Sequence, residues 1–135
     1  MKGTYAADEA ATRTIGAEFV RGLRVGEVVF LHGELGAGKT TLVRGMLEEL
    51  GVRDAVRSPT FNLVQVFDTD PPVMHADLYR VASHAGIGLE DYLETHLCLI
   101  EWPERAVGLI ETSQARHVVI EFEGPGRRIS ITKAT

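Results

Sequence analysis

The sequence predicts an α/β fold in which a mixed β-sheet is flanked by helices and ends in a C-terminal antiparallel strand pair. Three features predict it. Residues 28–31 are four consecutive apolar residues, as in a strand buried on both faces of a sheet. A glycine-rich turn follows, and after it apolar residues recur at helical spacing. Near the C-terminus, two segments with alternating apolar and polar residues flank the turn 124–126.

The first half of the chain divides into helix, strand, turn and helix. Asp8 is placed to cap a helix that we expect to end at Gly26. The strand at residues 27–32 leads into the glycine-rich turn 33–38, and the following helix should end at Gly51, a residue that readily takes the left-handed conformation. The apolar face of the first helix consists of Ala11, Ile15, Phe19 and Leu23.

The second half is richer in β-structure. Residues 61–67 and Val73–Asp77 read as two strands of a hairpin with a five-residue connection. A short helix at about residues 89–94 precedes a strand at 97–100, and Pro103 suits the first turn of another helix. The terminal strand pair is marked by Val118, Ile120 and Phe122, and then by Ile129 and Ile131.

Length, charge and composition limit the possible functions. A chain of 135 residues with 44% apolar residues fits one compact domain, residues 1–135. Its 14 Lys and Arg against 19 Asp and Glu give a net charge of -5, which argues against binding nucleic acid mainly through phosphates. The apolar runs are far shorter than the roughly 20 residues that span a bilayer, and the N-terminus does not resemble a secretory signal. The lone Cys98 excludes a disulfide framework, so we expect a cytoplasmic protein without membrane contact.

Residues 33–40, GELGAGKT, fit the phosphate-binding pattern G-x-x-x-x-G-K-[ST], with a strand directly before and a helix directly after. Glycines let backbone N–H groups converge on phosphate oxygens at the start of a helix. Lys39 supplies a charge for the β and γ phosphates, Thr40 a hydroxyl for Mg²⁺, and Thr41 a contact to the α phosphate. The predicted nucleotide-binding residues of this P-loop are Gly33, Glu34, Leu35, Gly36, Ala37, Gly38, Lys39, Thr40 and Thr41.

Two carboxylates are candidates to support a magnesium ion. If the helix after the loop returns the chain to the far edge of the sheet, Asp77 and Glu101 both end strands at the phosphate edge. From the spacing alone, each carboxylate could instead cap a helix or lie in solvent. Thr60 lies in a segment where a switch loop would sense the γ phosphate through a threonine hydroxyl. The alternative is that Thr60 is an ordinary turn residue. Trp102 fits a core residue better than a ligand contact.

Several nucleotide-dependent reactions share such a loop. GTP is disfavoured because Asn62, the single asparagine, is not followed by the lysine of N-K-x-D. A small-molecule kinase stays open but needs an acceptor pocket and an arginine-bearing lid, and a non-hydrolysing nucleotide sensor also stays open. The histidines show no metal-ligand spacing and are taken as structural: His32, His75, His84, His96 and His117.

Four motifs in order resemble the TsaE (formerly YjeE) family: GELGAGKTTLVRG at 33–45, SPTFNLV at 58–64, HADLYR at 75–80 and LCLIEWPER at 97–105. The resemblance implies a P-loop ATPase subunit of the bacterial machinery that makes threonylcarbamoyladenosine in tRNA. It implies slow, Mg²⁺-dependent ATP hydrolysis that is activated by a TsaB–TsaD heterodimer, in which TsaD carries the transferase site. Contact with tRNA would occur only through that complex.

The resemblance also implies roles for single residues. Thr40 and Glu101 would hold Mg²⁺, Asp77 would assist hydrolysis through water, and Thr60 would belong to a switch-like loop. The implied catalytic set is Lys39, Thr60, Asp77 and Glu101.

Around the nucleotide, Trp102 would border the ligand or a partner, and Thr12 would lie near adenine. Arg127 and Arg128 match a glycine-arginine feature without an assigned contact. Arg57 and Arg80 are candidates by position for an activating arginine, with a solvated or partner-facing charge as the alternative for each.

Overall fold

The computed structural model describes residues 3–53 and 63–133. Within them, seven strands form one sheet: β1 (Thr4–Ala6), β2 (Val28–His32), β3 (Val64–Phe67), β4 (Val73–Asp77), β5 (Leu97–Glu101), β6 (Arg116–Glu123) and β7 (Gly126–Lys133). Their order across the sheet is β1-β7-β6-β2-β5-β4-β3. The pairs β6–β2, β2–β5 and β5–β4 are parallel, whereas the outer pairs are antiparallel. The predicted α/β fold with a mixed sheet and a terminal antiparallel pair is confirmed.

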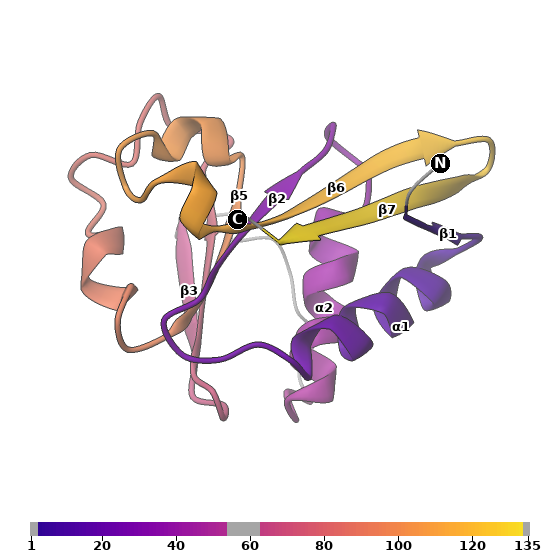
Figure 1. Cartoon of the computed structure of the whole chain (residues 1–135), viewed down its shortest axis with the longest axis horizontal. Coiled ribbons are helices and arrows are strands. Elements are labelled where there is room, and N and C mark those ends of the chain that lie inside the picture. The colour runs from indigo at the N-terminus through magenta and orange to yellow at the C-terminus, as the bar shows by residue number, and fades with distance from the viewer. Residues whose placement is uncertain (1–2, 54–62, 134–135) are drawn as a thin grey trace.

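The two faces of the sheet are covered differently. Helices α1 (Glu9–Val20) and α2 (Lys39–Glu49) pack on one face and against each other. The other face is covered by the connections 78–96 and 102–115, which contain the short 3₁₀ turns η1 (Leu89–Tyr92), η2 (Pro103–Ala106) and η3 (Thr112–Gln114). Figure 1 shows the two helices on one side of the sheet and these connections on the other.

The first helix is shorter than predicted. It begins as expected, because the Asp8 side chain accepts a hydrogen bond of 2.9 Å from the Ala11 backbone N–H. It ends at Val20 instead of Gly26. The backbone N–H groups that follow donate to carbonyl oxygens three residues earlier, as in the hydrogen bond from the Leu23 N–H to the Val20 carbonyl, so the α-helical pattern stops there. Gly26, with φ 90°, instead forms the turn into β2.

Three further expectations change in detail. The segments at residues 89–94 and after Pro103 form single 3₁₀ turns rather than α-helices, because each covers only four residues. Strand β1 was not predicted, since three residues carry too little periodicity to be recognised. The strand expected at residues 61–67 is present as Val64–Phe67, and residues 61 and 62 lie outside the described part.

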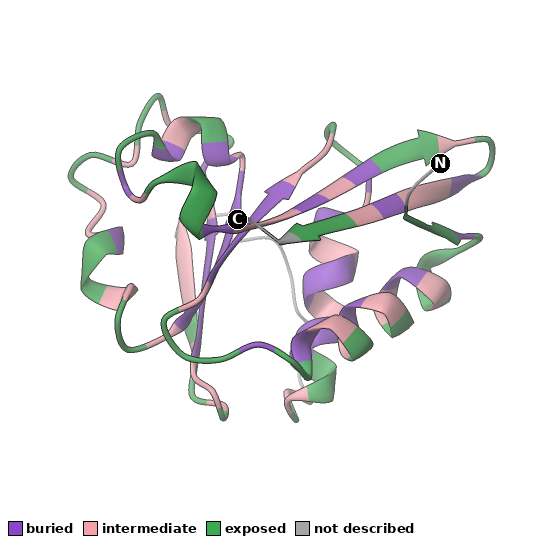
Figure 2. Cartoon of the chain, viewed as in Figure 1, coloured by how far each residue is buried: buried purple, intermediate pink, exposed green. Residues whose placement is uncertain are grey.

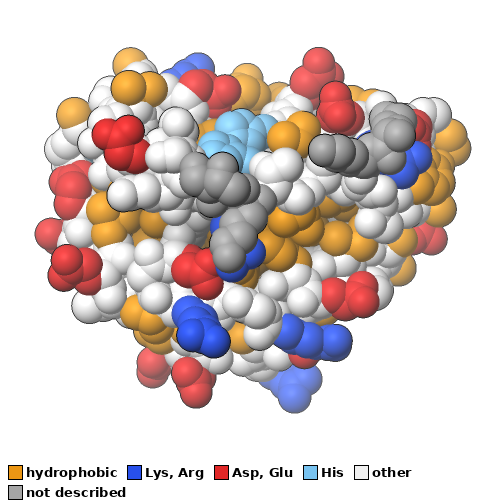
Figure 3. Space-filling model, viewed as in Figure 1, with side chains coloured by type: hydrophobic (Ala, Val, Ile, Leu, Met, Phe, Trp, Pro, Cys, Tyr) orange, Lys and Arg blue, Asp and Glu red, His pale blue; other side chains and the backbone are white. Residues whose placement is uncertain are grey.

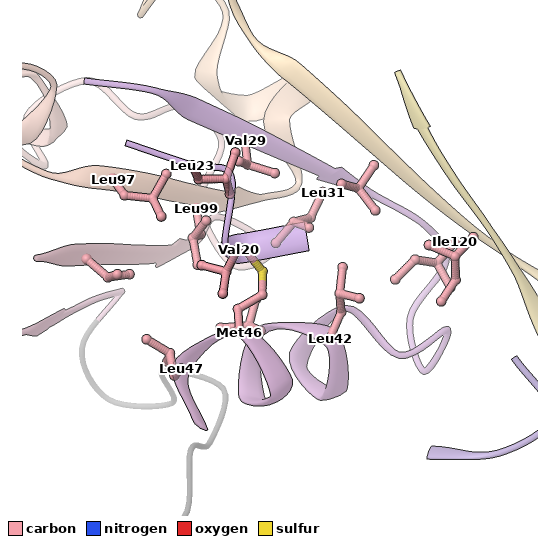
Figure 4. Close-up of a cluster of buried hydrophobic side chains, with 14 of the residues drawn as sticks. Val20, Leu23, Val29, Leu31, Leu42, Met46, Leu47, Leu97, Leu99 and Ile120 are labelled. Carbon is pink, nitrogen blue, oxygen red and sulfur yellow. The ribbon is translucent and has the colours of Figure 1, made fainter. Parts of the chain in front are cut away.

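The buried apolar run of β2 contributes side chains to the hydrophobic core on each face of the sheet. Val29 and Leu31 point to the helix side, whereas Val28 and Phe30 point to the opposite face. This explains why the strand is apolar without alternation. Figure 2 shows β2 and β5 buried along most of their length and green, exposed positions on the outer faces of the helices. Figure 4 shows the helix-side core, whose labelled side chains are Val20, Leu23, Val29, Leu31, Leu42, Met46, Leu47, Leu97, Leu99 and Ile120.

The topology brings three strand ends to one edge of the sheet. In register, Glu101 at the end of β5 lies opposite Leu31 of β2 on one side and opposite Asp77 of β4 on the other. The chain leaves β2 at this edge and enters α2 after a six-residue loop, residues 33–38. In the described parts of the chain, no helix is long and apolar enough to cross a membrane.

Candidate nucleotide-binding site

The loop between β2 and α2 requires glycine at two positions in particular. A Cβ on Gly33 would lie 2.8 Å from the Ile120 carbonyl oxygen, so a side chain does not fit between the loop and β6. Gly38 directly precedes α2 with φ 112°, a left-handed conformation that other residues adopt at a cost. No side-chain hydrogen bond caps α2 within the described structure, which leaves the amides of its first turn for a ligand.

Lys39 lies in the mouth of this loop and is only 5% exposed. Its Nζ donates a hydrogen bond of 2.6 Å to the Gly33 carbonyl oxygen and lies 3.8 Å from the centroid of the Trp102 ring. Burial lowers the pKa of Lys39, and the nearby carboxylates of Glu101 and Asp77 oppose that shift. The ammonium is therefore partly desolvated and already placed inside the loop.

Trp102 reaches Lys39 because of its backbone. It is the one non-glycine residue with positive φ (60°) among the residues described, and it forms the corner between β5 and η2. Such conformations cost free energy and are frequent at functional sites. The Tyr79 ring packs on the indole with centroids 4.8 Å apart. Trp102 is thus half-buried between Tyr79 and Lys39, next to the glycine-rich loop, and it is not a residue of the deep core.

Glu101 and Asp77 meet at the same edge, as the chain directions predicted. The Glu101 side chain is 3% exposed, and its Oε2 lies 3.4 Å from the donating hydroxyl of Thr40 and 2.7 Å from His75 Nε2. Asp77 is more open, and its Oδ1 accepts a hydrogen bond of 3.1 Å from the Tyr79 backbone N–H. A cavity of about 200 Å³ is lined by Leu35, Gly36, Gly38, Lys39, Thr40, Thr41, Asp77, Glu101 and Trp102.

This donor set fits Mg²⁺ bound together with phosphates. The Thr40 hydroxyl and the Glu101 carboxylate are hard oxygen ligands beside each other. Among the described residues, no group of three or more His, Cys, Asp or Glu could hold a metal ion by itself. Mg²⁺ commonly takes one or two protein ligands and completes its octahedron with phosphate and water, which matches such a partial site.

A second cavity, of about 350 Å³, lies on the other side of the loop. Thr12 of α1 lines it together with Thr41 and Arg127, and Thr12 is 3% exposed. The remaining lining comes from residues 6–9, the loop glycines and the turn before β7. The structure therefore brings Thr12 next to the P-loop, in a space of the size that small ligands occupy.

Two residues of this region make contacts that the sequence did not indicate: Arg127, which had no assigned contact, and His75. Arg127 of β7 donates from Nε to the Ala37 carbonyl oxygen at 2.9 Å, and its guanidinium carbon lies 4.4 Å from the Phe122 ring centroid. His75, taken as structural, is fully buried against Glu101. His75 lies two residues before Asp77, so both lie on one face of β4, and this spacing is the sequence signal that links them.

Other predicted residues lie elsewhere. Arg128 pairs with Glu123 at 2.7 Å, on the other side of β7 from the loop. Leu35 is 66% exposed at the tip of the loop, and Glu34 beside it is exposed as well. Thr60 and Arg57 lie outside the described residues.

A larger cavity, of about 660 Å³, lacks the features expected of a nucleotide site. It lies on the face of the sheet opposite α1 and α2, and its polar lining includes Glu104, Glu111 and the pair His32 and His117, whose ring nitrogens lie 2.9 Å apart. Its lining is mostly apolar and contains no lysine or arginine among the described residues. As far as the chain is described, it offers no lysine, no arginine and no α-helix N-terminus to a phosphate group.

Comparisons with known proteins agree with the motifs. The sequence model of the family described as "Threonylcarbamoyl adenosine biosynthesis protein TsaE" matches residues 6–129. The protein named tRNA threonylcarbamoyladenosine biosynthesis protein TsaE of Haemophilus influenzae is 39% identical over 80% of this chain and 71% of its own length. The protein of the same name from Streptomyces coelicolor is 42% identical, covering 70% of this chain and 69% of its own.

The fold is also shared with a solved structure. The crystal structure of YdiB from Bacillus subtilis superposes with a TM-score of 0.84 at 27% identity, over 98% of this chain and 84% of that one. Together with the family match over nearly the whole chain, these similarities show that the protein belongs to the TsaE family of tRNA threonylcarbamoyladenosine biosynthesis.

Proposed function

We propose that this protein binds ATP with Mg²⁺ at the edge of the sheet where α2 begins and hydrolyses it slowly. In doing so it serves the TsaB–TsaD transferase as an accessory subunit and does not transfer the threonylcarbamoyl group itself. The observation that carries the proposal is the convergence of Lys39, Thr40 and Glu101 around one cavity at that edge. Each residue there is of the type that nucleotide phosphates and Mg²⁺ require.

Phosphate binding follows from the start of α2. The uncapped first turn presents backbone N–H groups and the positive end of the helix dipole. Lys39 exchanges its hydrogen bond with the Gly33 carbonyl for one with a phosphate oxygen, which is a charge-assisted bond and the stronger of the two. A partly desolvated ammonium makes that exchange more favourable.

Hydrolysis needs a metal and an oriented water. When bound, Mg²⁺ neutralises charge on the phosphates, and Thr40 with Glu101 would hold it. Asp77 faces the same cavity and is less buried than Glu101, so its carboxylate can hold and orient a water molecule. Lys39 binds phosphate oxygens during this step.

The cavity itself explains why the isolated protein should be slow. No arginine is among the described residues that line it. An arginine supplied to such a site raises the rate by roughly 10³ to 10⁵. Leu35 and Tyr79, 66% and 43% exposed, lie at or beside its mouth and provide apolar surface for a partner. A partner that covers this mouth can therefore complete the site.

Direct binding of tRNA is not part of the proposal. The net charge is -5, and Figure 3 shows acidic side chains spread around one face, with basic side chains at its lower edge and a few elsewhere. Such a surface supplies few phosphate contacts to RNA. The proposed setting is the cytoplasm, with tRNA reached through the protein complex.

The test is steady-state release of ADP and phosphate by purified protein, with and without the TsaB–TsaD pair and with and without tRNA. We expect slow turnover alone, faster turnover with the protein pair, and little effect of tRNA alone. Transfer of phosphate to an added metabolite would favour the small-molecule kinase. Tight ATP binding without turnover, even beside the protein pair, would favour the nucleotide sensor, and strong stimulation by free tRNA would contradict the accessory role.

A further inference from the structure

His75 is a buried polar side chain whose only described hydrogen-bond partner is Glu101. Its side chain is 0% exposed, and Nε2 lies 2.7 Å from Glu101 Oε2. A carboxylate oxygen can only accept here, so Nε2 carries the hydrogen. Nδ1 is buried without a hydrogen-bond partner in the described structure. The ring therefore directs its one donor at Glu101.

We propose that His75 is a positioning residue that orients the Glu101 carboxylate for the metal ion of the nucleotide site. The inference rests on the proposed function, because it concerns the same metal. The oxygen that His75 holds, Oε2, is also the one that faces the Thr40 hydroxyl at 3.4 Å. His75 thereby fixes where the carboxylate lies relative to Thr40, the other protein ligand offered to the metal.

Packing alone does not account for a histidine at this position. His75 lies opposite Leu99 in β5, and Val73 and Leu97 on the same face are buried and apolar. An apolar side chain would fill such a place without leaving a buried nitrogen unpaired, which is unfavourable for folding. A histidine with one unpaired nitrogen is instead consistent with a second layer of residues that orients metal ligands.

Two substitutions separate the hydrogen bond from the packing. His75→Met keeps an apolar side chain of similar length and removes the donor, whereas His75→Gln keeps an N–H group that can reach Glu101. We expect the Mg²⁺ concentration needed for half-maximal tightening of ATP binding to rise by about 10- to 100-fold in His75→Met. His75→Gln should recover a large part of that loss. ATP affinity in excess EDTA should stay at the wild-type value in both variants.

The outcomes distinguish this inference from the proposed function. If the wild-type protein shows no Mg²⁺-dependent ATP binding, the proposed function fails. If the wild type binds Mg²⁺ with ATP and His75→Met does so at the same Mg²⁺ concentration, only the role of His75 fails. Two results would assign His75 a structural role and overturn the inference. In one, His75→Met loses as much ATP affinity without Mg²⁺ as with it. In the other, His75→Gln needs as much additional Mg²⁺ as His75→Met.

Two further measurements make the test independent of any one variant. If His75 acts through Glu101, adding His75→Met to Glu101→Gln should change the Mg²⁺ dependence no further. In the unaltered protein, long-range ¹⁵N NMR should show His75 protonated at Nε2, with a shift when Mg²⁺ is added to the ATP-bound protein. His84, which bonds to the Val107 carbonyl on the other side of the sheet, should not shift. A His75 ring protonated at Nδ1 alone would overturn the inference.

Discussion

The indole ring of Trp102 covers the ammonium of Lys39, whose Nζ lies 3.8 Å from the ring centroid. The two residues come from opposite ends of the site, one from the corner after β5 and the other from the first turn of α2. The ring is attracted to the cation and also shields it from water. Because Trp102 is the only tryptophan of the chain, its fluorescence reports on the position of Lys39.

The first prediction uses this pair. Binding of ATP with Mg²⁺ should change the Trp102 emission, because the ammonium moves from the Gly33 carbonyl towards phosphate oxygens. Lys39→Ala should nearly abolish both the fluorescence change and the heat of binding measured by calorimetry, because the charged donor is lost. Its circular dichroism should match the wild type. An unchanged nucleotide titration in Lys39→Ala would contradict the role of the lysine.

The second prediction concerns the hydrogen bonds by which Arg127 of β7 supports the glycine-rich loop at residues 33–38. Arg127 donates to the carbonyl oxygens of Ala37 at 2.9 Å and Gly36 at 3.4 Å, and these two hydrogen bonds hold the loop in its shape. Hydrogen bonds from charged groups contribute about 1.5–3 kcal/mol, so Arg127→Met should weaken ATP binding by roughly 10-fold or more. Arg128→Met is the matched control, since Arg128 pairs with Glu123 and does not reach the loop. Equal losses in the two variants, measured by calorimetry, would refute a specific support by Arg127.

The third prediction concerns the contact between the two helices. A Cβ at Gly45 would lie 2.6 Å from the Arg13 Cα and even closer to its carbonyl oxygen, so α1 would be pushed away. Alanine gains about 1 kcal/mol over glycine in helix propensity, but overpacking costs about 1–3 kcal/mol and here involves backbone. Gly45→Ala should therefore lower the free energy of unfolding in urea. Gly22→Ala, where a Cβ meets nothing within 4 Å, should leave it unchanged or slightly higher.

The sequence was sufficient to place most residues of the candidate site at one edge of the sheet. A buried run, a glycine loop and a helix fix the direction of β2 and α2, and strand directions then bring Asp77 and Glu101 to the same edge. This inference needs no side-chain detail, because the carboxyl ends of parallel strands meet at one edge. The contact between Thr40 and Glu101, 61 residues apart, follows from it.

Long-range contacts that depend on register could not be predicted. Arg127 reaches Ala37 from 90 residues away, and a shift of β7 by one residue would turn Arg127 to the other face and bring Arg128 to the loop. The hydrogen bond of His75 to Glu101 depends in the same way on the pairing of β4 with β5. The end of α1 at Val20 could not be predicted because the apolar helical spacing continues to Leu23. Leu23 is buried, but it lies in the turn after the helix.

The fourth prediction concerns Cys98. Burial raises the pKa of its thiol from 9.0 to about 12, so at pH 8 the reactive thiolate should be about 1000-fold rarer than in the unfolded chain. Native protein should therefore react very slowly with iodoacetamide, and urea should make the thiol fully reactive. Since the folded pKa is the higher one, the protonated thiol stabilises the fold fully below about pH 9, and this contribution is lost as the pH rises towards 12. Equal labelling rates with and without urea would show that the thiol is accessible in the native protein.

The last prediction separates the two acids. Glu101 is buried beside the Thr40 hydroxyl, so Glu101→Gln, which keeps the shape and removes the charge, should raise the Mg²⁺ concentration needed for ATP binding by about 10-fold or more. Asp77 lines the same cavity but is more exposed, so Asp77→Asn should leave ATP affinity within about threefold and lower turnover by roughly 10²- to 10⁴-fold, as the loss of a group that orients water would. Binding is measured by calorimetry across a Mg²⁺ series, and turnover with the TsaB–TsaD pair present. If Mg²⁺ dependence is unaltered in Glu101→Gln and weakened in Asp77→Asn, then Asp77 is the metal ligand and the two roles are reversed.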